Sequence, residues 1–235
     1  MNISLVAMVW NRPTEHIERW AAHLKTHPDC PRTILIDQSA RNLNFDNSVV
    51  CRRYGINHFY TPRETMNMSL AFNLGLKLVN VDVEYVMFTG IDWLFSPNFF
   101  AVLQSKVGER KFINCLGGYL PEACDLTQDW SALVTLAEQS EISRRLSPGV
   151  CQCVPWRWAY EVHGYDERFP AQDGVDDDFR SRAIKAGLEN IWIEWTEAQA
   201  LHIWHERSPL KGVGSELFGD APIIANPNGW GQYEG

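Results

Sequence analysis

The sequence predicts one α/β domain with a mostly parallel central sheet and helices on both of its faces. Short apolar runs typical of buried strands alternate with segments of helical periodicity, as in successive strand–helix–strand units. The length of 235 residues, with 45% hydrophobic and 21% charged residues, is that of an ordinary globular domain. No apolar run reaches the roughly 18 residues that a membrane-spanning helix needs.

The first hundred residues carry most of this alternation. Apolar residues of the first helix fall at positions i, i+3, i+4 and i+7, which places them in one stripe. Thr14 is the expected cap of that helix, and Ser96 is the expected cap of the last, with Pro97 at its first position. Strands are expected at 3–10, 33–37, 56–60 and 85–89, and helices from 14, at 66–79 and from 96.

The second half has fewer regular patterns. An amphipathic helix is expected around 130–136, a helix start at 176–178, and strand character at 191–195 and 201–205. The tail, 208–235, is rich in Gly and Pro, which is typical of a surface or lid segment. Six cysteines show no pairing pattern, and Cys151 and Cys153 are expected as buried thiols in a strand.

Charge and motifs exclude several classes of function. The net charge is −8, with 29 acidic and 21 basic residues, and such a surface repels nucleic acid because no basic run offsets it. The N-terminus lacks a basic segment and a cleavage site, which predicts a cytoplasmic protein. Neither GxGxxG nor GxxxxGK[ST] occurs, so no dinucleotide site or P-loop is predicted.

Polar residues follow the predicted strands at the points where the apolar runs stop. Because the carboxyl ends of parallel strands meet at one edge of a sheet, these residues predict a ligand site there. They are Trp10-Asn11-Arg12, Asp37-Gln38-Ser39, Thr61-Pro62-Arg63 and Gly90-Ile91-Asp92.

The run 3–97 resembles the nucleotide-sugar-binding half of the GT-A glycosyltransferases, family 2 in particular. Four motifs carry the resemblance: the first strand with Asn11-Arg12 after it, Leu35-Ile36-Asp37-Gln38-Ser39, Ala71-Phe72-Asn73-Leu74-Gly75 and the turn 88–97. That turn holds Asp-x-Asp in the family, whereas here Gly90 takes the first position and only Asp92 remains. The resemblance implies a UDP-sugar site formed by Trp10, Asn11, Arg12, Asp37, Arg63, Asn73 and Asp92.

The run 163–187 is similar to the C-terminal segment of the galactosyltransferase type, as in families 7 and 27. Two motifs carry this second resemblance: His163-Gly164-Tyr165-Asp166-Glu167-Arg168-Phe169 and Asp173-Gly174-Val175-Asp176-Asp177-Asp178. His163 replaces the first glycine of the family pattern, and Val175 replaces its glutamate. The two resemblances imply one GT-A domain, with a nucleotide-sugar half at 1–100 and an acceptor-binding and catalytic half at 101–207.

The resemblance also implies roles for neighbouring residues of the catalytic half. Asp176 would be the general base that takes the proton of the acceptor hydroxyl, and Asp177 would orient the acceptor. Neighbours on a helix point about 100° apart, so the three aspartates at 176–178 are expected to face a cleft, to cap the helix and to pair with an arginine. Trp156 and Trp158, expected on one face of an extended stretch, would either pack in the core or stack on the acceptor sugar.

A metal site follows from the same resemblance. Taken alone, His202 and His205 are typical of one core and one surface histidine, because positions i and i+3 of a strand do not share a face. In the galactosyltransferase-type segment the histidine in the place of His205 binds the metal, and His202 would join it. With Asp92 they form an oxygen and nitrogen set suited to Mn²⁺ or Mg²⁺.

The implied function is transfer of a hexose or N-acetylhexosamine from a UDP-sugar to a glycan or lipid-linked glycan, with inversion. Such an enzyme would act in polysaccharide biosynthesis, and a lipid-linked acceptor would bring it to a membrane surface. A retaining GalNAc-transferase-like enzyme is the first alternative. The second is a degenerate GT-A domain that binds sugar nucleotide or glycan without turnover, which the absent carboxylates at Gly90 and Val175 favour.

Overall fold

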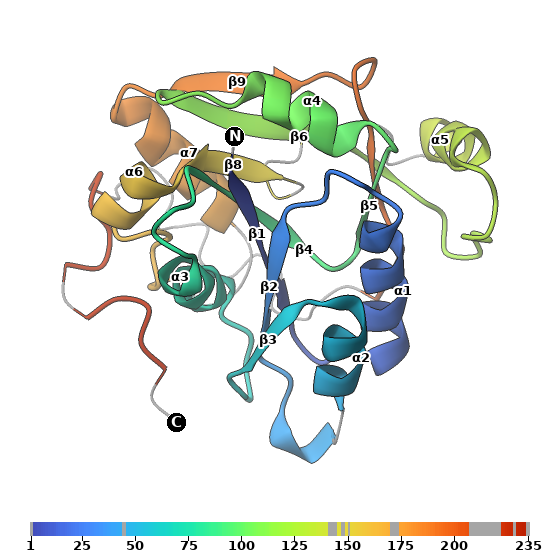
Figure 1. Ribbon diagram of the computed structural model, residues 1–235, viewed down its shortest axis with the longest axis horizontal. Coiled ribbons are helices and arrows are strands. Elements are labelled where there is room, and N and C mark those ends of the chain that lie inside the picture. Colours follow the sequence, from blue (N-terminus) through green and yellow to red (C-terminus); the bar gives the residue numbers. More distant parts are fainter. Residues whose placement is uncertain are drawn as a thin grey trace.

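The computed structural model describes residues 2–43, 46–140, 145–146, 149, 151–169, 174–206, 222–227 and 229–233. Figure 1 shows a curled central sheet with helices packed on both faces, which confirms the predicted α/β class. In the described part of the chain, no helix is long and apolar enough to cross a membrane. Asp173 and residues 208–221 of the predicted lid lie outside the described residues.

The N-terminal half forms a parallel sheet in the strand order β3-β2-β1-β4. Each predicted strand and helix is present within three residues of its expected bounds, and a further helix, α2, was not predicted. The elements are β1 Ile3–Val9, α1 Thr14–Lys25, β2 Arg32–Asp37, α2 Asn47–Tyr54, β3 Asn57–Tyr60, α3 Met68–Leu78 and β4 Tyr85–Gly90.

Two predicted helix caps are wrong. Thr14 lies inside α1, where its hydroxyl donates to Oδ1 of Asn47 at 2.9 Å, and Pro13 occupies the cap position. Helix α4, Phe99–Lys106, begins three residues after Ser96. The Ser96 hydroxyl donates to Oδ1 of Asn98 at 2.8 Å, and the Ser96 carbonyl accepts the backbone N–H of Phe99, so this residue forms the turn that precedes the helix.

The rest of the chain extends and curls the sheet through β6, Lys111–Tyr119. The first part of β6 pairs with β8 and β9, and its last part pairs with β7 and β10. Strand β8 runs antiparallel to β4 and joins the two halves. The remaining elements are β5 Trp93–Phe95, α5 Trp130–Gln139, β7 Arg145–Leu146, β8 Gln152–Pro155, α6 Trp156–Glu161, α7 Val175–Lys185, β9 Glu189–Ile193 and β10 Ala200–His202.

Alternate residues of β1 build two separate cores. Leu5 and Ala7 pack in the cluster that holds the apolar residues of α1, α2 and α4. Val6 and Met8 face the opposite way, into the cluster formed with α3, α6 and α7. A strand covered on both faces must be apolar at every position, which explains the continuous run seen in the sequence. Cys151 and Cys153 are free and fully buried in the first of these cores, as predicted.

Residues 222–227 and 229–233 lie along α3 and the loop that follows α6. Asn226 donates its side-chain amide to the carbonyl oxygens of His163 and Tyr165, and its Oδ1 accepts from the backbone N–H of Glu167. Trp230 stacks on the His163 ring, with ring centres 5.4 Å apart, and its carbonyl accepts from Lys77. This segment therefore fixes the loop 163–167 against α3.

Close packing of α3 on β1 predicts that Gly75→Ala destabilises the protein. A Cβ at Gly75 would lie 2.2 Å from Cγ1 of Val6, far inside a normal contact. Alanine at an open helix position stabilises by up to about 1 kcal/mol relative to glycine, whereas overpacking a core costs about 1–3 kcal/mol. We expect a net loss in the free energy of unfolding, measured in urea.

The Val6→Ala background is the control for this change, because it removes the carbon that the new Cβ would meet. Gly75→Ala should cost less free energy of unfolding there than in the wild type. A Gly75→Ala protein as stable as the wild type would contradict the packing described above.

Candidate functional site

The centre of the site is Asp92, which follows β4 and directly precedes β5. Its backbone carbonyl accepts the N–H of Ile203 at 2.8 Å, so the chain after β10 is held against it. Its side chain is 27% exposed, at the end of the sheet where ligands bind in open α/β folds. A single carboxylate thus marks this end of β4, as the sequence predicted.

Strand pairing brings His202 to Asp92. Strand β10 runs antiparallel to β5 and pairs His202 with Trp93, the residue after Asp92. The imidazole packs edge-on against the Trp93 ring, with ring centres 4.8 Å apart, and its Nε2 lies 3.3 Å from Oδ2 of Asp92. Two positions 110 residues apart in the chain therefore meet through backbone pairing.

His205 reaches the same carboxylate because β10 ends at His202. In a continued strand the two rings would point to opposite faces, but residues 203–206 leave the sheet. Nε2 of His205 lies 2.7 Å from Oδ2 of Asp92, and the two imidazole centres lie 4.9 Å apart. Burial alone would raise the pKa of Asp92, but its contacts with the two imidazoles hold that pKa well below the usual value.

The glycine in place of the family's first aspartate leaves room for Asp92. A Cβ at Gly90 would lie 2.4 Å from Oδ1 of Asp92. Any side chain there would have to displace the Asp92 carboxylate from its present position. Gly90 thus lets the Asp92 carboxylate lie where it contacts the two imidazoles.

These three side chains could hold a divalent cation. One ligand atom from each of Asp92, His202 and His205 lies within 4.8 Å of the other two. In octahedral coordination with bonds of about 2.1 Å, neighbouring ligand atoms lie about 3 Å apart, and the contacts of 2.7 and 3.3 Å to Oδ2 of Asp92 are close to that separation. One carboxylate and two imidazoles suit a first-row divalent ion such as Mn²⁺.

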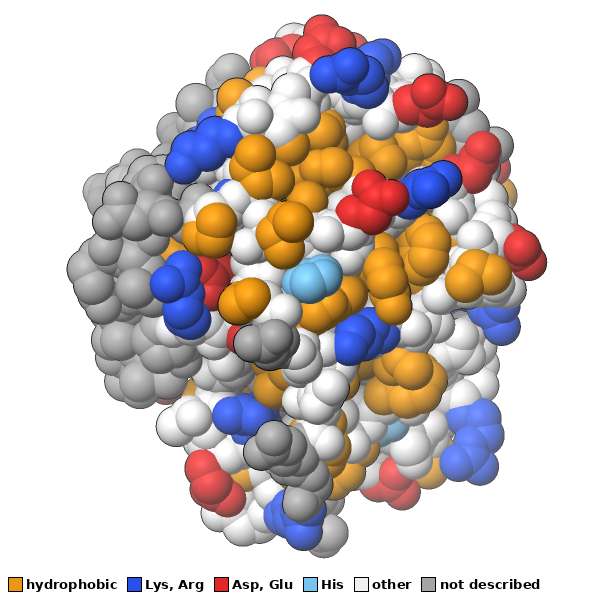
Figure 2. All heavy atoms as spheres, turned by 90° about the vertical axis from the view of Figure 1, so that its left-hand side faces the viewer, with side chains coloured by type: hydrophobic (Ala, Val, Ile, Leu, Met, Phe, Trp, Pro, Cys, Tyr) orange, Lys and Arg blue, Asp and Glu red, His pale blue; other side chains and the backbone are white. Residues whose placement is uncertain are grey.

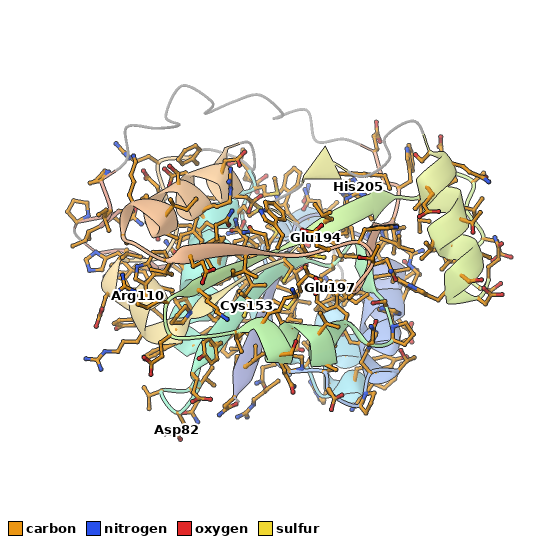
Figure 3. All side chains as sticks on the ribbon, turned by 90° about the horizontal axis from the view of Figure 1, so that it is seen from above. Asp82, Arg110, Cys153, Glu194, Glu197 and His205 are labelled. Atoms are coloured by element: carbon orange, nitrogen blue, oxygen red, sulfur yellow. The ribbon has the colours of Figure 1, made fainter. Side chains whose placement is uncertain are left out.

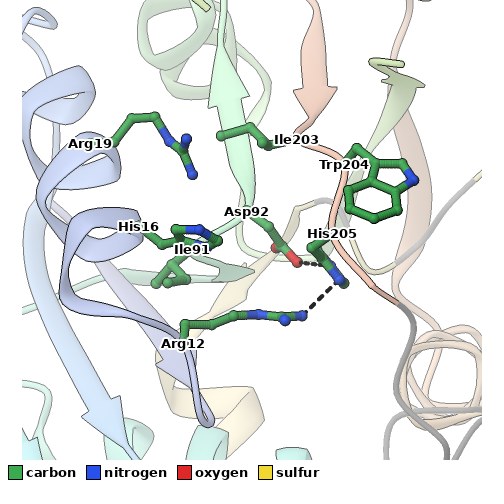
Figure 4. A pocket seen from close by; sticks show the side chains of 8 residues that line it. All are labelled: Arg12, His16, Arg19, Ile91, Asp92, Ile203, Trp204 and His205. Atoms are coloured by element: carbon green, nitrogen blue, oxygen red, sulfur yellow. Dashed lines mark hydrogen bonds and ion pairs between the residues drawn. The ribbon is translucent and has the colours of Figure 1, made fainter. Parts of the chain in front are cut away.

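Arg12 contacts the second nitrogen of His205 (Figure 4). Its Nη2 lies 2.7 Å from Nδ1, which also lies 2.8 Å from the carbonyl oxygen of Glu206. A guanidinium only donates, so this contact needs a lone pair on Nδ1 and leaves the proton on Nε2, facing Asp92. Binding of a cation through Nε2 of His205 requires the other tautomer, in which Nδ1 carries the proton and donates it to the carbonyl oxygen of Glu206. A bound cation would therefore free the guanidinium of Arg12.

Asp37 and Asn11, two of the residues predicted to bind the UDP-sugar, join the ends of β1 and β2. Asp37 is 1% exposed, and its oxygens accept from the N–H of Ser39, from Asn47 and from His58 at 2.7–3.0 Å. These donors offset the burial that would raise the pKa of Asp37, and the net pKa is lowered. Asn11, at a positive φ of 52°, accepts the N–H of Ala40 through its side chain. Direct contact of Asp37 with a nucleotide stays a prediction.

Trp10 and Arg63 also lie at this edge of the sheet. Nε1 of Trp10 donates to the carbonyl oxygen of Arg63 at 3.3 Å, and the N–H of Arg63 donates to that of Gln38 at 3.1 Å. Both side chains are half-buried. Their backbone links place the ends of β1, β2 and β3 next to one another, as expected of a nucleotide site.

The prediction that Asn73 binds the UDP-sugar is wrong. Its side chain is fully buried, donates to the carbonyl of Tyr165 and to Glu167 at 2.8 Å each, and accepts the N–H of Tyr165 at 2.7 Å. A Cβ at Gly164 would lie 2.0 Å from its Oδ1. The Ala-x-Asn-x-Gly helix therefore serves packing: the asparagine fixes the loop 163–167, and Gly75 allows α3 to approach β1.

Asp176 lies at the start of α7, at the same end of the sheet as Asp92. Its backbone carbonyl accepts from Gln152, which pairs with Phe88 near the end of β4. Its half-buried carboxylate has no hydrogen-bond partner among the described residues and lies beside Gly149, where a Cβ would meet Oδ2 at 2.4 Å. Burial, together with the neighbouring charge of Asp177, raises the pKa of Asp176 to about 7.

The other two aspartates of this turn are paired with arginines. Asp177 accepts from Arg180 at 3.0 Å, and Asp178 accepts from Arg182 at 2.8 Å in a fully buried pair. The predicted division of roles thus holds in part, but no aspartate caps the helix, since Gly174 occupies the cap position without a side chain. Among the three, Asp176 alone keeps a carboxylate available to a ligand.

Trp156 and Trp158 do not lie on one face of an extended stretch, and both pack against the second core, which was the alternative to acceptor binding. They lie in helix α6, where positions i and i+2 point about 200° apart. Nε1 of Trp156 donates to the carbonyl of Leu76, and Trp158 packs against Phe179. Helix α6 follows Pro155, which pairs with Tyr85 at the first residue of β4, so Trp156 lies at the opposite end of that strand from Asp92.

Trp156 and Asp92 therefore lie on different parts of the surface. Trp156 lines a surface hollow with Val81, Val83 and Tyr160 on the face beside α6, where apolar side chains gather among charged ones (Figure 2). Asp82, just before β4, and His205 lie at opposite sides of the molecule in Figure 3. Stacking of an acceptor on Trp156 next to the Asp92 carboxylate is therefore excluded by position.

Sequence reasoning missed His16 and Arg19, which line a pocket beside Asp92 and His205. Their spacing of one helical turn on α1, four and seven residues after Arg12, was the available signal. It also missed His58, whose contact with Asp37 depends on the pairing of β2 with β3.

Comparison with known proteins places the fold. No protein-family model and no curated protein sequence matches the chain. The structure is similar to that of GalNAc-T7 with UDP, GalNAc and Mn²⁺, with a TM-score of 0.64 and 14% identity over 87% of this chain and 44% of that one. It is also similar to S. aureus TarS in complex with UDP-GlcNAc, with a TM-score of 0.62 and 14% identity over 91% of this chain and 61% of that one.

The chain thus spans less than two thirds of the length of either of these structures. At 14% identity the likeness concerns the fold. The arrangement of the strands and of the helices on both faces is that of the GT-A glycosyltransferases, and the chain has the GT-A fold.

Proposed function

We propose that this protein is a metal-dependent glycosyltransferase that moves a hexose or N-acetylhexosamine from a UDP-sugar to a glycan hydroxyl. One observation carries the proposal: a GT-A sheet holds, at the same end, a possible cation site and an acid of raised pKa that has no hydrogen-bond partner among the described residues. The first is formed by Asp92, His202 and His205, and the second is Asp176. The solved structures named above contain UDP or UDP-GlcNAc, and that of GalNAc-T7 contains Mn²⁺, which supports this choice of donor and ion.

In this proposal the ends of β1, β2 and β3 bind the nucleotide, and Asp92, His202 and His205 hold the ion. When bound, a divalent ion neutralises the charge that grows on the leaving diphosphate. Arg12, freed from His205, lies where it can donate to the same phosphate oxygens.

Asp176 is the proposed base. The acceptor oxygen forms a bond to the anomeric carbon as the bond from that carbon to the diphosphate breaks, and the carboxylate of Asp176 takes the hydroxyl proton. A single displacement of this kind inverts the anomeric centre. Val175 is buried in the core, at 1% exposure, so the glutamate absent from this position would not have fitted the present packing.

A GT-A domain that binds sugar nucleotide without turnover is the second candidate, because Gly90 leaves one carboxylate in the turn. The two histidines beside Asp92 argue for a working ion site. Release of UDP from a panel of UDP-sugars, with Mn²⁺ and candidate acceptors, distinguishes the two functions. We expect release with one donor; a panel in which UDP raises the melting temperature but no donor is consumed would support the binding domain.

The ion site predicts that His205→Ala abolishes binding of Mn²⁺. The change removes one of three ligands and leaves β10 and its pairing intact. Titration of the metal followed by Mn²⁺ electron paramagnetic resonance measures this directly. Glu206→Gln is the matched control, because it neutralises an exposed acid next to His205 without touching the backbone carbonyl. Equal Mn²⁺ affinity of His205→Ala and the wild type would refute the ligand assignment.

The base predicts that Asp176→Asn lowers turnover by about 10² or more, with donor affinity within a few fold of the wild type. A base must be ionised, and the pKa of Asp176 is raised to about 7. The wild-type kcat/KM should therefore fall as the pH falls below about 7, and the residual activity of Asp176→Asn should lack this limb.

Asp177→Asn is the control for this change, since it removes a neighbouring charge that is already paired with Arg180. It should retain most of the turnover. A normal rate for Asp176→Asn together with a lost rate for Asp177→Asn would move the base by one residue.

A further inference from the structure

Gln152 is a buried polar residue that the proposed reaction does not use. It is the first residue of β8, it pairs with Phe88 near the end of β4, and it is 1% exposed. Its Nε2 donates to the backbone carbonyl of Asp176 at 2.8 Å, and its Oε1 accepts from the Tyr165 hydroxyl at 2.7 Å. One side chain on the sheet is therefore bonded at once to the first turn of α7 and to the loop 163–167.

The direction of these two hydrogen bonds is fixed by the groups that form them. A backbone carbonyl only accepts, so the amide nitrogen of Gln152 must face Asp176. The amide oxygen then faces Tyr165, whose hydroxyl must donate. Loss of either bond would leave a buried polar atom without a partner, which costs about 1–3 kcal/mol. The three residues thus form a network that is satisfied in one arrangement.

Tyr165 is the anchored end of this network. Its ring is fully buried and stacks on Phe179, with ring centres 4.1 Å apart. Its backbone N–H donates to Asn73 at 2.7 Å, and its carbonyl accepts from Asn73 at 2.8 Å and from Asn226 at 2.6 Å. Helix α3 and residues 222–227 therefore hold the loop to which Gln152 is bonded.

The other end of the network holds the backbone of the proposed base. The carboxylate of Asp176 has no hydrogen-bond partner among the described residues, so its place depends on where its own backbone lies. Gly174 occupies the cap position of α7 and offers no side chain to fix the first turn. The bond from Gln152 fixes this turn to the sheet instead. A displacement of about 1 Å in a reacting group can lower a rate by about 10².

We propose that Gln152 is a positioning residue, which holds the carboxylate of Asp176 at the end of β4 through the backbone of α7, with Tyr165 as its anchor. This inference rests on the proposed function, because it takes Asp176 as the base. A glutamine that only packs contributes stability alone. A positioning glutamine, in contrast, sets the turnover of a protein that remains folded.

The pKa of Asp176 gives a second view of the same position. Asp177, paired with Arg180, is its charged neighbour on α7. On the side of β8, burial raises the pKa of Tyr165 and of Cys151, so both groups are neutral there. Burial is also the main cause of the raised pKa of Asp176. If the first turn of α7 were released, water would reach this carboxylate, and its pKa should fall towards the ordinary value.

Turnover by Gln152→Met and by the double variant Gln152→Met/Tyr165→Phe is the test, at about pH 8.5, where Asp176 is ionised. Methionine has a similar length without the polar atoms, and phenylalanine removes the hydroxyl that would lose its acceptor. Both variants should lose about tenfold or more in kcat, with the KM of the UDP-sugar within about threefold of the wild type. Tyr165→Phe alone keeps the bond to Asp176 and should lose less.

Gln128→Met is the matched control, because Gln128 is exposed before α5 and lies outside this network. Circular dichroism melts verify the fold of each variant. The pKa of Asp176, followed through its ¹³C carboxyl resonance, is measured without turnover, and Asp176→Asn identifies the resonance. It should stay at about 7 in the control and fall in the double variant.

A folded double variant with the kcat and the Asp176 pKa of the wild type would overturn the proposal and leave the proposed function standing. A lowered Asp176 pKa in the double variant of a protein that consumes no UDP-sugar would support the link through Gln152 and reject the proposed function.

Discussion

The antiparallel pairing of β10 with β5 is the interaction on which the candidate site depends. It sets His202 beside Trp93 and thereby beside Asp92, and it ends at the residue from which the chain must turn for His205 to reach the same carboxylate. None of these side chains is placed by local structure alone. The site is therefore formed only when the second half of the chain has completed the curled sheet begun by the first, and its geometry is as rigid as the backbone pairing beneath it.

Electrostatics give the two sides of this site different properties. On the side of α1, Arg12, His16 and Arg19 line a small pocket beside Asp92, and Nε of Arg19 is buried without a hydrogen-bond partner among the described residues. On the side of α7, Asp176 is half-buried next to the charge of Asp177, which raises its pKa to about 7 and makes it a better base near neutral pH.

The sequence predicted most strands and helices of the first half because they are apolar and bounded by turn residues; β3, with four mostly exposed residues, was found from its place between such elements. Prediction from the sequence failed where tertiary contacts determine the secondary structure or the role of a residue. Trp156 and Trp158 are helical, although their alternation is typical of a strand, and Asn73 is a buried link whose partners lie 92 and 94 residues away. The association of Asp92 with His202 and His205 came from a family resemblance, since strand geometry by itself separates the two histidines. The pocket on α1 required only helical spacing and could have been found from it.

The measurement that tests the account most directly is the position of the ion in a crystal grown with UDP and Mn²⁺, located from anomalous scattering at the manganese edge. The account predicts one peak within bonding distance, about 2.0–2.3 Å, of Oδ2 of Asp92 and of Nε2 of both His202 and His205. It also predicts that Arg12 has left Nδ1 of His205. A peak beyond bonding distance of these atoms, or UDP bound at full occupancy with Asp92 and His205 still in direct contact, would contradict it.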